Sequence, residues 1–392
     1  MIPRQPSLRT THFIIIFLLV SLNLRMAFSA ADPLLAEIRK SLDIGAGKSG
    51  LFGLLPVMAL GIAAPMGARL VQWIQASQLV MYALLLALAG IIWRSNGNIT
   101  GLFGGTILIG LGLGMAGSVM LGVMRQEVKH NTAEVMSAYT ACVSLGTAIG
   151  AGAAEPVANL AGGWQHGLLF WGIPLLVSVI LWGRIMRLQH GSFTRHSHAR
   201  VEVLPLLKEK NPRMITLYYL FRVASAWLLI VWLAFLMQQR GLSSVDAGFA
   251  LSLVTISQIP GAMLTSILSR WLGGIHRLIP PATVLAICSC WVLLVAPLML
   301  WPWAAMALGM GLGCIFSIGM TLMTISQPDE AGTIALSGLA QGVGFVGGGL
   351  LAWGAGLCIK LPFPCIWMAG LYSLLSLCGL YFGIQCREEP AR

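Results

Sequence analysis

Two arginines stand inside long apolar segments of the chain. Arg25 lies near the middle of an apolar segment at 12–38, and Arg222 lies in another at 214–238. A helix over either segment is long enough to cross a bilayer, and an arginine at that depth is costly unless it faces a cavity or a partner. The planar guanidinium suits an anion or a nitro or carboxylate group, so Arg25 and Arg222 are predicted to bind substrate. The alternative for Arg25 is a structural arginine that pairs with helix carbonyls and locks neighbouring helices.

The spacing of these arginines repeats between the two halves of the chain. Arg25 precedes Gly50 by 25 residues, Arg222 precedes Gly248 by 26, and the two glycines are 198 residues apart. Similar offsets separate Arg69 from Arg270 (201 residues) and Ser137 from Ser337 (200 residues). Such repetition is typical of transporters built from two parallel repeats, with a site at the repeat interface near the midplane. One residue of difference rotates a side chain by about 100° on a helix, so Arg25 is the stronger candidate.

Composition requires a lipid environment for these segments. The 392 residues are 57% hydrophobic and 9% charged, whereas a soluble protein is about 25% charged. Apolar runs of about 20 residues recur along the chain, each able to cross the hydrocarbon core. Twelve spans are predicted: 12–38, 49–68, 76–94, 101–124, 134–156, 166–187, 214–238, 245–268, 278–298, 302–324, 333–357 and 364–385. We therefore predict an all-α membrane protein with twelve transmembrane helices in two pseudo-symmetric six-helix bundles.

The basic residues predict the domain boundaries and the topology. Residues 1–188 form the first predicted bundle, 189–213 a polar central loop, and 214–392 the second bundle. With the N-terminus inside, 16 lysines and arginines fall on the inner side and 6 on the outer side, which favours cytoplasmic termini and a cytoplasmic central loop. The net charge of +11 is spread over short loops instead of one face, so no nucleic-acid partner is expected.

Four further residues in or beside these segments are candidates for the site. Gln258 and Gln341 carry amides that a helix or a ligand must satisfy in an apolar environment. Trp232 could stack on a flat substrate or anchor the helix at the membrane interface. Asp32 lies seven residues after Arg25, two turns along the same face of the predicted helix. It is a candidate for carrying a coupling proton; the alternative is a carboxylate that sits in water at the mouth of the cavity.

The remaining motifs exclude several classes of protein. The eight cysteines form no CxxC pair, and we expect neither a metal site nor a cofactor. No P-loop, HExxH or GxSxG motif is present, so we expect no catalytic residues and no ATP-driven pump. Cys358 and Cys365 flank a proline-containing loop on the predicted outer side, where a disulfide or two free thiols are both open.

Several short motifs carry a resemblance to a known family. They are Leu24-Arg25, Pro33-Leu34-Leu35, Gly117-Ser118-Val119, Trp232-Leu233 and Ala340-Gln341-Gly342-Val343-Gly344-Phe345. With the 6+6 duplication they make the whole chain resemble the major facilitator superfamily, and most of all its cyanate and 2-nitroimidazole permease branch. The resemblance implies the major facilitator fold, with helices one, four, seven and ten lining the cavity. Ser118, where the branch tends to carry Asn, then becomes a substrate contact of smaller size.

Departures from the family pattern bear on the function. The loop between helices two and three lacks the usual Asp near Arg69, and Glu155-Pro156 replaces the Gly-Pro of drug antiporters. The resulting prediction is a monomeric secondary transporter in the cytoplasmic membrane that moves a small polar or anionic organic solute by alternating access, with protons as a candidate coupling ion. The alternatives are a proton-coupled drug or metabolite exporter and a membrane sensor without flux.

Overall fold

The computed structural model describes residues 8–43, 46–128, 131–189, 203, 205–356 and 362–386. Every regular element in these ranges is a helix, which confirms the predicted all-α class. The first half contains α1 (Leu8–Ser29), α2 (Leu35–Ser41), α3 (Ala46–Leu70), α4 (Ala76–Arg94), α5 (Ile99–Glu127), α6 (Thr132–Ala161), α7 (Trp164–Phe170) and α8 (Gly172–Gln189). The second contains η1 (Pro205–Leu207), α9 (Lys210–Gln239), α10 (Ser244–Leu272), η2 (His276–Leu278), α11 (Ile279–Val295), η3 (Leu298–Leu300), α12 (Trp301–Ile325), α13 (Glu330–Gly354) and α14 (Pro364–Gly383).

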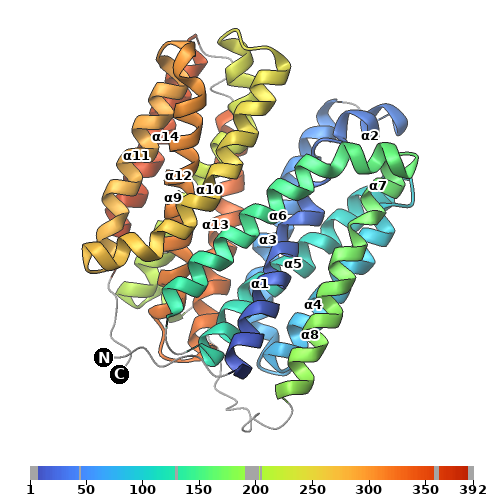
Figure 1. The fold of residues 1–392 in the computed structure, drawn as a ribbon, viewed down its shortest axis with the longest axis vertical. Helices are drawn as coiled ribbons and strands as arrows, with labels where there is room; N and C mark the ends of the chain where they lie inside the picture. The colour runs from blue at the N-terminus through green and yellow to red at the C-terminus, as the bar shows by residue number, and fades with distance from the viewer. Residues whose placement is uncertain are drawn as a thin grey trace.

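These helices account for the twelve predicted spans. Eleven segments of the described chain are long and apolar enough to cross a membrane. The fifth of them, which is the sixth predicted span, is formed by α7 and α8 together. The remaining span is α3, 25 residues long, whose described apolar stretch is Leu54–Leu70. Figure 1 shows the helices as two groups, α1 to α8 in blue to green and α9 to α14 in yellow to red.

The first predicted span is wrong in one respect, because it is not a continuous helix over 12–38. The helix α1 ends at Ser29, a turn follows, and the short helix α2 begins at Leu35. Pro33 lies in this turn, where its missing N–H cannot continue the helical hydrogen bonds. Arg25 therefore lies one turn before the end of α1, not near mid-helix. Asp32 lies in the turn, not two turns along the same helical face.

Glycines bring α1 and α6 into backbone contact on either side of Arg25. A Cβ atom at Gly146 would collide with the carbonyl oxygen of Leu22, and one at Gly150 with that of Met26. The second half repeats this arrangement 198 residues later. There Gly344 and Gly348 of α13 pack against α9 at Tyr219 and at Val223–Ala224. The duplication predicted from sequence offsets is thus repeated in helix packing, and it holds each arginine-bearing helix against a glycine-bearing one.

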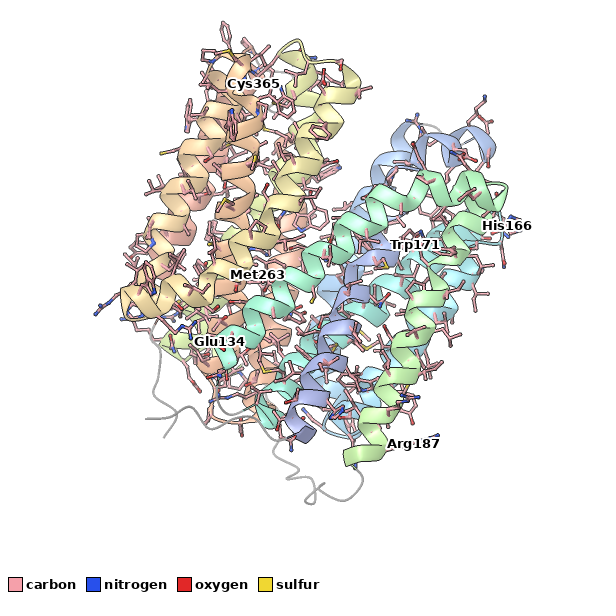
Figure 2. All side chains as sticks on the ribbon, viewed as in Figure 1. Glu134, His166, Trp171, Arg187, Met263 and Cys365 are labelled. Carbon is pink, nitrogen blue, oxygen red and sulfur yellow. The ribbon has the colours of Figure 1, made fainter. Side chains whose placement is uncertain are left out.

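The two halves touch on the side where α1 begins and α14 ends, and they diverge toward α2 and α7 (Figure 1). Arg270 Nη1 of α10 contacts Glu134 Oε1 of α6 at 2.7 Å. Closer to the centre, the Ser137 and Ser317 hydroxyls are 3.1 Å apart, and the Ser337 hydroxyl donates to the Ser118 carbonyl at 2.7 Å. All these contacts cross between the halves, so the protein is closed on this side. Figure 2 shows Glu134 at this closed end and Cys365 at the opposite end.

Cys365 lies near the start of α14 and has no disulfide partner among the described residues. Its Sγ lies 3.7 Å from the carbonyl oxygen of Leu236. Cys358 lies outside the described residues, so whether the two cysteines can pair stays open. Most of the central loop also lies outside the described residues. The domain boundaries at 188 and 213 therefore remain a prediction.

Candidate functional site

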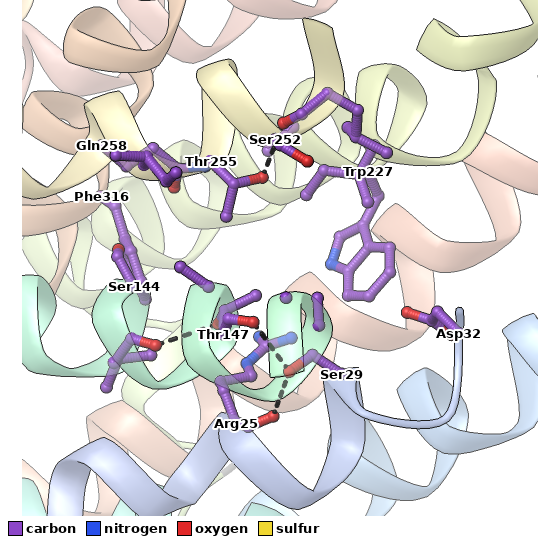
Figure 3. A pocket seen from close by; sticks show the side chains of 18 of the residues that line it. Arg25, Ser29, Asp32, Ser144, Thr147, Trp227, Ser252, Thr255, Gln258 and Phe316 are labelled. Carbon is purple, nitrogen blue, oxygen red and sulfur yellow. Dashed lines mark hydrogen bonds between the residues drawn. The ribbon is translucent and has the colours of Figure 1, made fainter. Parts of the chain in front are cut away.

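A cavity of about 530 Å³ lies between the two halves. Its walls come from α1, the turn after it and α6 on one side, and from α9, α10 and α12 on the other. Figure 3 shows Arg25 and Thr147 on one wall, with Trp227, Thr255 and Gln258 on the wall facing it. Both arginines predicted from the sequence line this one cavity.

Arg25 is half-buried among aromatic rings from both halves. Its guanidinium carbon lies 5.7 Å from the ring centroid of Phe28, 5.7 Å from that of Trp227 and 5.4 Å from that of Phe345. These distances fit cation–π contacts, which stabilise a charge while leaving its N–H groups available. Among the described residues its guanidinium is thus placed by rings instead of by helix carbonyls, contrary to the locking role considered from sequence.

Arg222 approaches the cavity from α9. Its guanidinium carbon lies 4.0 Å from the ring centroid of Phe316 and 5.5 Å from that of Tyr219. Its Nε atom is buried without a hydrogen-bond partner. Within the described ranges no carboxylate forms an ion pair with Arg25 or Arg222, so neither cavity arginine is neutralised by a carboxylate in direct contact.

Asp32 lies at the rim of the cavity, in the turn after α1. Its side chain opens onto the cavity, but the protein around it removes enough water to raise the pKa of its carboxyl group to about 6. The nearby charge of Arg94 acts in the opposite direction. Arg94 is only 1% exposed, and its Nη2 donates to the carbonyl oxygen of Ala27 at 2.9 Å. This arginine therefore ties α4 to α1 just before the turn that carries Asp32.

Small polar residues line the cavity between the arginines and the rim. The Ser29 hydroxyl donates to the Thr147 carbonyl of α6 at 3.0 Å, which joins α1 to α6 beside Arg25. Thr147 and Thr255 donate to carbonyls four residues earlier in their own helices. Their hydroxyl oxygens can still accept hydrogen bonds. Gln258 is half-buried and lines the α10 wall of the cavity. Its contact with a ligand remains a prediction.

Three predicted site residues do not line this cavity. Ser118 is fully buried and donates to the carbonyl oxygens of Ala64 and Met115, both at 3.1 Å. Trp232 donates from Nε1 to the Ala352 carbonyl at 3.0 Å, which joins α9 to α13. Gln341 is buried on α13, and its Nε2 atom has no partner among the described residues.

The helices that line the cavity also differ from the expectation. The resemblance implied that helices one, four, seven and ten line the cavity. Instead, α6 and α10, the fifth and eighth spans, supply much of the wall, and α5, the fourth span, supplies none of it. The reason is packing: α5 lies deep in its bundle, where a Cβ atom at Gly114 would lie 2.6 Å from the Leu60 carbonyl oxygen of α3.

The aromatic residues of the site were not among the residues predicted from the sequence. Trp227, Phe316 and Phe345 surround the two guanidinium groups, and each comes from a different helix. Their position relative to the arginines depends on packing between helices far apart in the chain. The one local signal was Trp227, which lies five residues after Arg222 on the same helix.

Comparison with known proteins identifies the family. The profile of the Major Facilitator Superfamily matches residues 16–352. The chain is 26% identical over 379 residues to the 2-nitroimidazole transporter of Escherichia coli (strain K12), covering 93% of this chain and 94% of that protein. It is 26% identical over 382 residues to the cyanate transport protein CynX of the same organism, covering 97% of each.

Solved structures agree with this family. The human organic anion transporter MFSD10 (TETRAN) matches with a TM-score of 0.77 at 14% identity, covering 97% of this chain and 100% of that one. The superfamily transporter FucP in the outward conformation matches with a TM-score of 0.75 at 14% identity and the same coverage. These likenesses confirm the predicted fold and the resemblance to the cyanate and 2-nitroimidazole transporters. The chain belongs to the major facilitator superfamily and is a multi-pass secondary transporter.

Proposed function

We propose that this transporter moves a small, flat anion across the cytoplasmic membrane. The proposal rests on the pair Arg25 and Arg222, which reach one cavity from different halves. Among the described residues, no carboxylate is in contact with either guanidinium group. Two cations that share a cavity repel each other when it is empty, and an anion between them relieves that repulsion. The names of two relatives, a cyanate and a 2-nitroimidazole transporter, are those of small, flat molecules and support the same class.

Each residue of the cavity has a role in this proposal. Arg25 and Arg222 supply charge and hydrogen-bond donors, and Trp227 supplies an aromatic face against which a flat substrate can stack. Gln258 contributes an amide from the α10 wall. Ser118, Gln341 and Trp232, which lie outside the cavity lining, remain in the proposal as contacts that a change of conformation would have to expose.

The transport cycle follows from the two ends of the cavity. The halves are joined on the closed side by pairs such as Glu134–Arg270, so this form is open to the opposite side. Substrate enters from there, the open side closes, and the joined side separates. The 16-to-6 distribution of basic residues supports cytoplasmic termini, and the open side then faces outward. The cycle needs one chain only, and we propose a monomer.

Protons are the proposed coupling ion, with Asp32 as their carrier. A carboxyl group with a pKa of about 6 exchanges its proton within the physiological range, and Asp32 lies on the substrate cavity. The same property suits a proton-coupled exporter, which is the second candidate function. The direction of net transport separates the two.

Uptake by proteoliposomes of purified protein tests the proposal. Labelled cyanate, 2-nitroimidazole and short monocarboxylates are offered, each with and without an inward proton gradient. We expect saturable uptake of at least one of the anions, competition between the anions, and no competition by organic cations. Uptake of cations in preference to anions, or no uptake of any of these solutes, would contradict the proposed substrate class. Accumulation driven by an outward-directed proton gradient, and not by an inward one, would favour the proton-coupled exporter, because an antiporter takes solute in as protons leave.

A further inference from the structure

Tyr219 lies directly behind the arginine pair, on the closed side of the cavity. It precedes Arg222 by three residues, about one turn of α9, and its side chain is fully buried. Its ring meets the Phe345 ring edge-on with the centroids 6.2 Å apart. Gly344 of α13 makes room for it, because a Cβ atom there would lie 2.6 Å from Cδ1 of Tyr219. The ring is therefore fixed in place between α9 and α13.

The hydroxyl group of Tyr219 has no hydrogen-bond partner among the described residues. Its polar neighbours are Arg222, over its ring, and Arg25 and Tyr139, within electrostatic reach. Arg222 approaches the phenol oxygen, and arginine donates hydrogen bonds but cannot accept them. Tyr139 could accept the phenol proton, but no hydrogen bond joins the two hydroxyl groups within the described residues. A buried O–H group in this condition costs stability unless something else accepts its proton.

Tyr218, the preceding residue on α9, has a buried hydroxyl group that does find an acceptor. Tyr218 is 1% exposed, and its hydroxyl donates to the carbonyl oxygen of Ile315 at 3.2 Å. Two adjacent tyrosines with almost equal burial therefore differ in one respect. The hydroxyl of Tyr218 is satisfied by the fold, whereas that of Tyr219 is left unsatisfied beside the arginines.

Other unsatisfied donors lie in the same region. Seven buried polar side-chain atoms lack a partner within the described residues, and three of them are Tyr219 Oη, Arg222 Nε and Gln341 Nε2. Gln341 precedes Phe345 by four residues on α13, about one helical turn. All three of these groups can donate a hydrogen bond, and they come from the two helices that pack together behind the cavity. A ligand that satisfies them must carry several acceptor atoms.

We propose that Tyr219 is a substrate-binding residue whose hydroxyl donates a hydrogen bond to the anion held by Arg25 and Arg222. This inference rests on the proposed function and adds to it a requirement on the substrate. The anion must present a second acceptor atom, oxygen or nitrogen, beyond the one that faces the arginines. Tyr219 lies on the closed side of the cavity. The hydrogen bond from its hydroxyl to the anion therefore forms as the anion moves past Arg25 and Arg222 toward that side. Gln341 Nε2 is the next donor along that path.

The test compares Tyr219→Phe with Tyr218→Phe, which removes a hydroxyl of almost equal burial from the adjacent position. Thermal unfolding of the purified proteins without substrate gives the first measurement. Tyr219→Phe should unfold at the wild-type temperature or above it, because within the described residues the phenol proton has no acceptor to lose. Tyr218→Phe should unfold at a lower temperature, because the Ile315 carbonyl loses its donor.

Uptake of cyanate by proteoliposomes gives the second measurement. The half-saturating cyanate concentration should rise about tenfold or more in Tyr219→Phe, the size of one hydrogen bond to a charged partner. It should stay within about twofold of wild type in Tyr218→Phe, a difference of less than about 0.5 kcal/mol, because the hydroxyl removed there is already bonded to the Ile315 carbonyl. Wild-type half-saturation in Tyr219→Phe would overturn the inference. So would a loss of thermal stability equal to that of Tyr218→Phe, because the hydroxyl would then have a structural partner.

Arg25→Ala distinguishes a failure of the proposed role of Tyr219 from a failure of the proposed function on which that role rests. If Arg25→Ala abolishes cyanate uptake while Tyr219→Phe transports normally, the arginine site stands and the role of Tyr219 is excluded. If the wild-type protein transports no anion, the proposed function fails and the inference fails with it.

Discussion

Arg25 shows how a charge is held inside a membrane protein without being neutralised. Three rings from two halves surround its guanidinium at 5.4 to 5.7 Å, and aromatic faces attract a cation without using its N–H groups. A salt bridge would have stabilised the charge more directly, but it would also have occupied the donors. The arrangement leaves the paired N–H donors of the Arg25 guanidinium free to bind a ligand.

The first prediction at this scale concerns the planar shape of the Arg25 guanidinium group. Arg25→Lys should lower the rate of anion uptake at low substrate about 10- to 100-fold, because a point charge loses the paired, planar donors. Arg25→Ala should abolish uptake while the protein still reaches the membrane in wild-type amounts. Arg184→Lys, a change at an exposed position of α8, is the matched control. Uptake at the wild-type rate in Arg25→Ala would show that the site lies elsewhere.

The second prediction follows from Asp32. Its pKa of about 6 means that the carboxyl is mostly neutral below pH 6 and mostly charged above it. A negative charge at the rim opposes entry of an anion, so the half-saturating anion concentration should rise as the pH increases through about 6. Asp32→Asn should remove this dependence and keep the low value at all pH values, and it should also abolish accumulation driven by a proton gradient.

Glu37→Gln is the control for Asp32, because Glu37 is an exposed carboxylate on α2 outside the cavity lining. It should leave the pH profile unchanged. A pH midpoint near 6 that persists in Asp32→Asn would assign the titration to another group.

Much of the site was predictable at the level of single residues. Arg25, Arg222, Gln258 and Asp32 line the cavity because polar groups within apolar spans have few other places to go. Ser118 and Trp232 lie outside the cavity lining, because a hydroxyl or an indole N–H is easily satisfied by a nearby carbonyl. The aromatic partners of the arginines were not predictable, since apolar residues are common on every face of every span.

At the scale of elements, glycine sets the position of the arginine-bearing helices. The backbone of α6 reaches that of α1 at Gly146 and Gly150, and this contact places Arg25 and Thr147 on one wall. The spans themselves were predictable from the length of the apolar runs. The breaks at Pro33 and between α7 and α8 were not, because a run stays apolar across a turn of a few residues.

The third prediction concerns this contact between helices. Gly146→Ala adds a methyl group that would collide with the Leu22 carbonyl oxygen, and overpacking of this kind costs about 1–3 kcal/mol. We expect a lower unfolding temperature and slower anion uptake, because α1 and Arg25 must move. Gly370→Ala in α14 is the control: nothing lies within 4 Å of a Cβ atom there, so stability should be unchanged or higher. Equal behaviour of the two variants would mean that α1 and α6 separate without cost.

At the scale of the whole molecule, the two halves are alike in packing and unlike in chemistry. Gly146 and Gly150 correspond to Gly344 and Gly348 at one offset of 198 residues. At that offset the partner of Arg25 is Val223, not Arg222. The arginine pair is therefore displaced by one residue from strict symmetry, and Arg222 faces Phe316 and Tyr219 instead of an aromatic set like that around Arg25. The two sides of the substrate thus meet different groups.

The last prediction concerns the orientation of the molecule in the membrane. Glu209 and Gln239 lie at opposite ends of α9, a helix of 30 residues and therefore about 45 Å long, and both are exposed. The 16-to-6 distribution of basic residues places Glu209 on the cytoplasmic side and Gln239 outside. In intact cells, a membrane-impermeant maleimide should label Gln239→Cys, and it should label Glu209→Cys only after the membrane is permeabilised. Because both positions lie on one helix, they cannot share a side while α9 spans the bilayer. Labelling of Glu209→Cys alone in intact cells would invert the topology, and the open cavity would then face the cytoplasm.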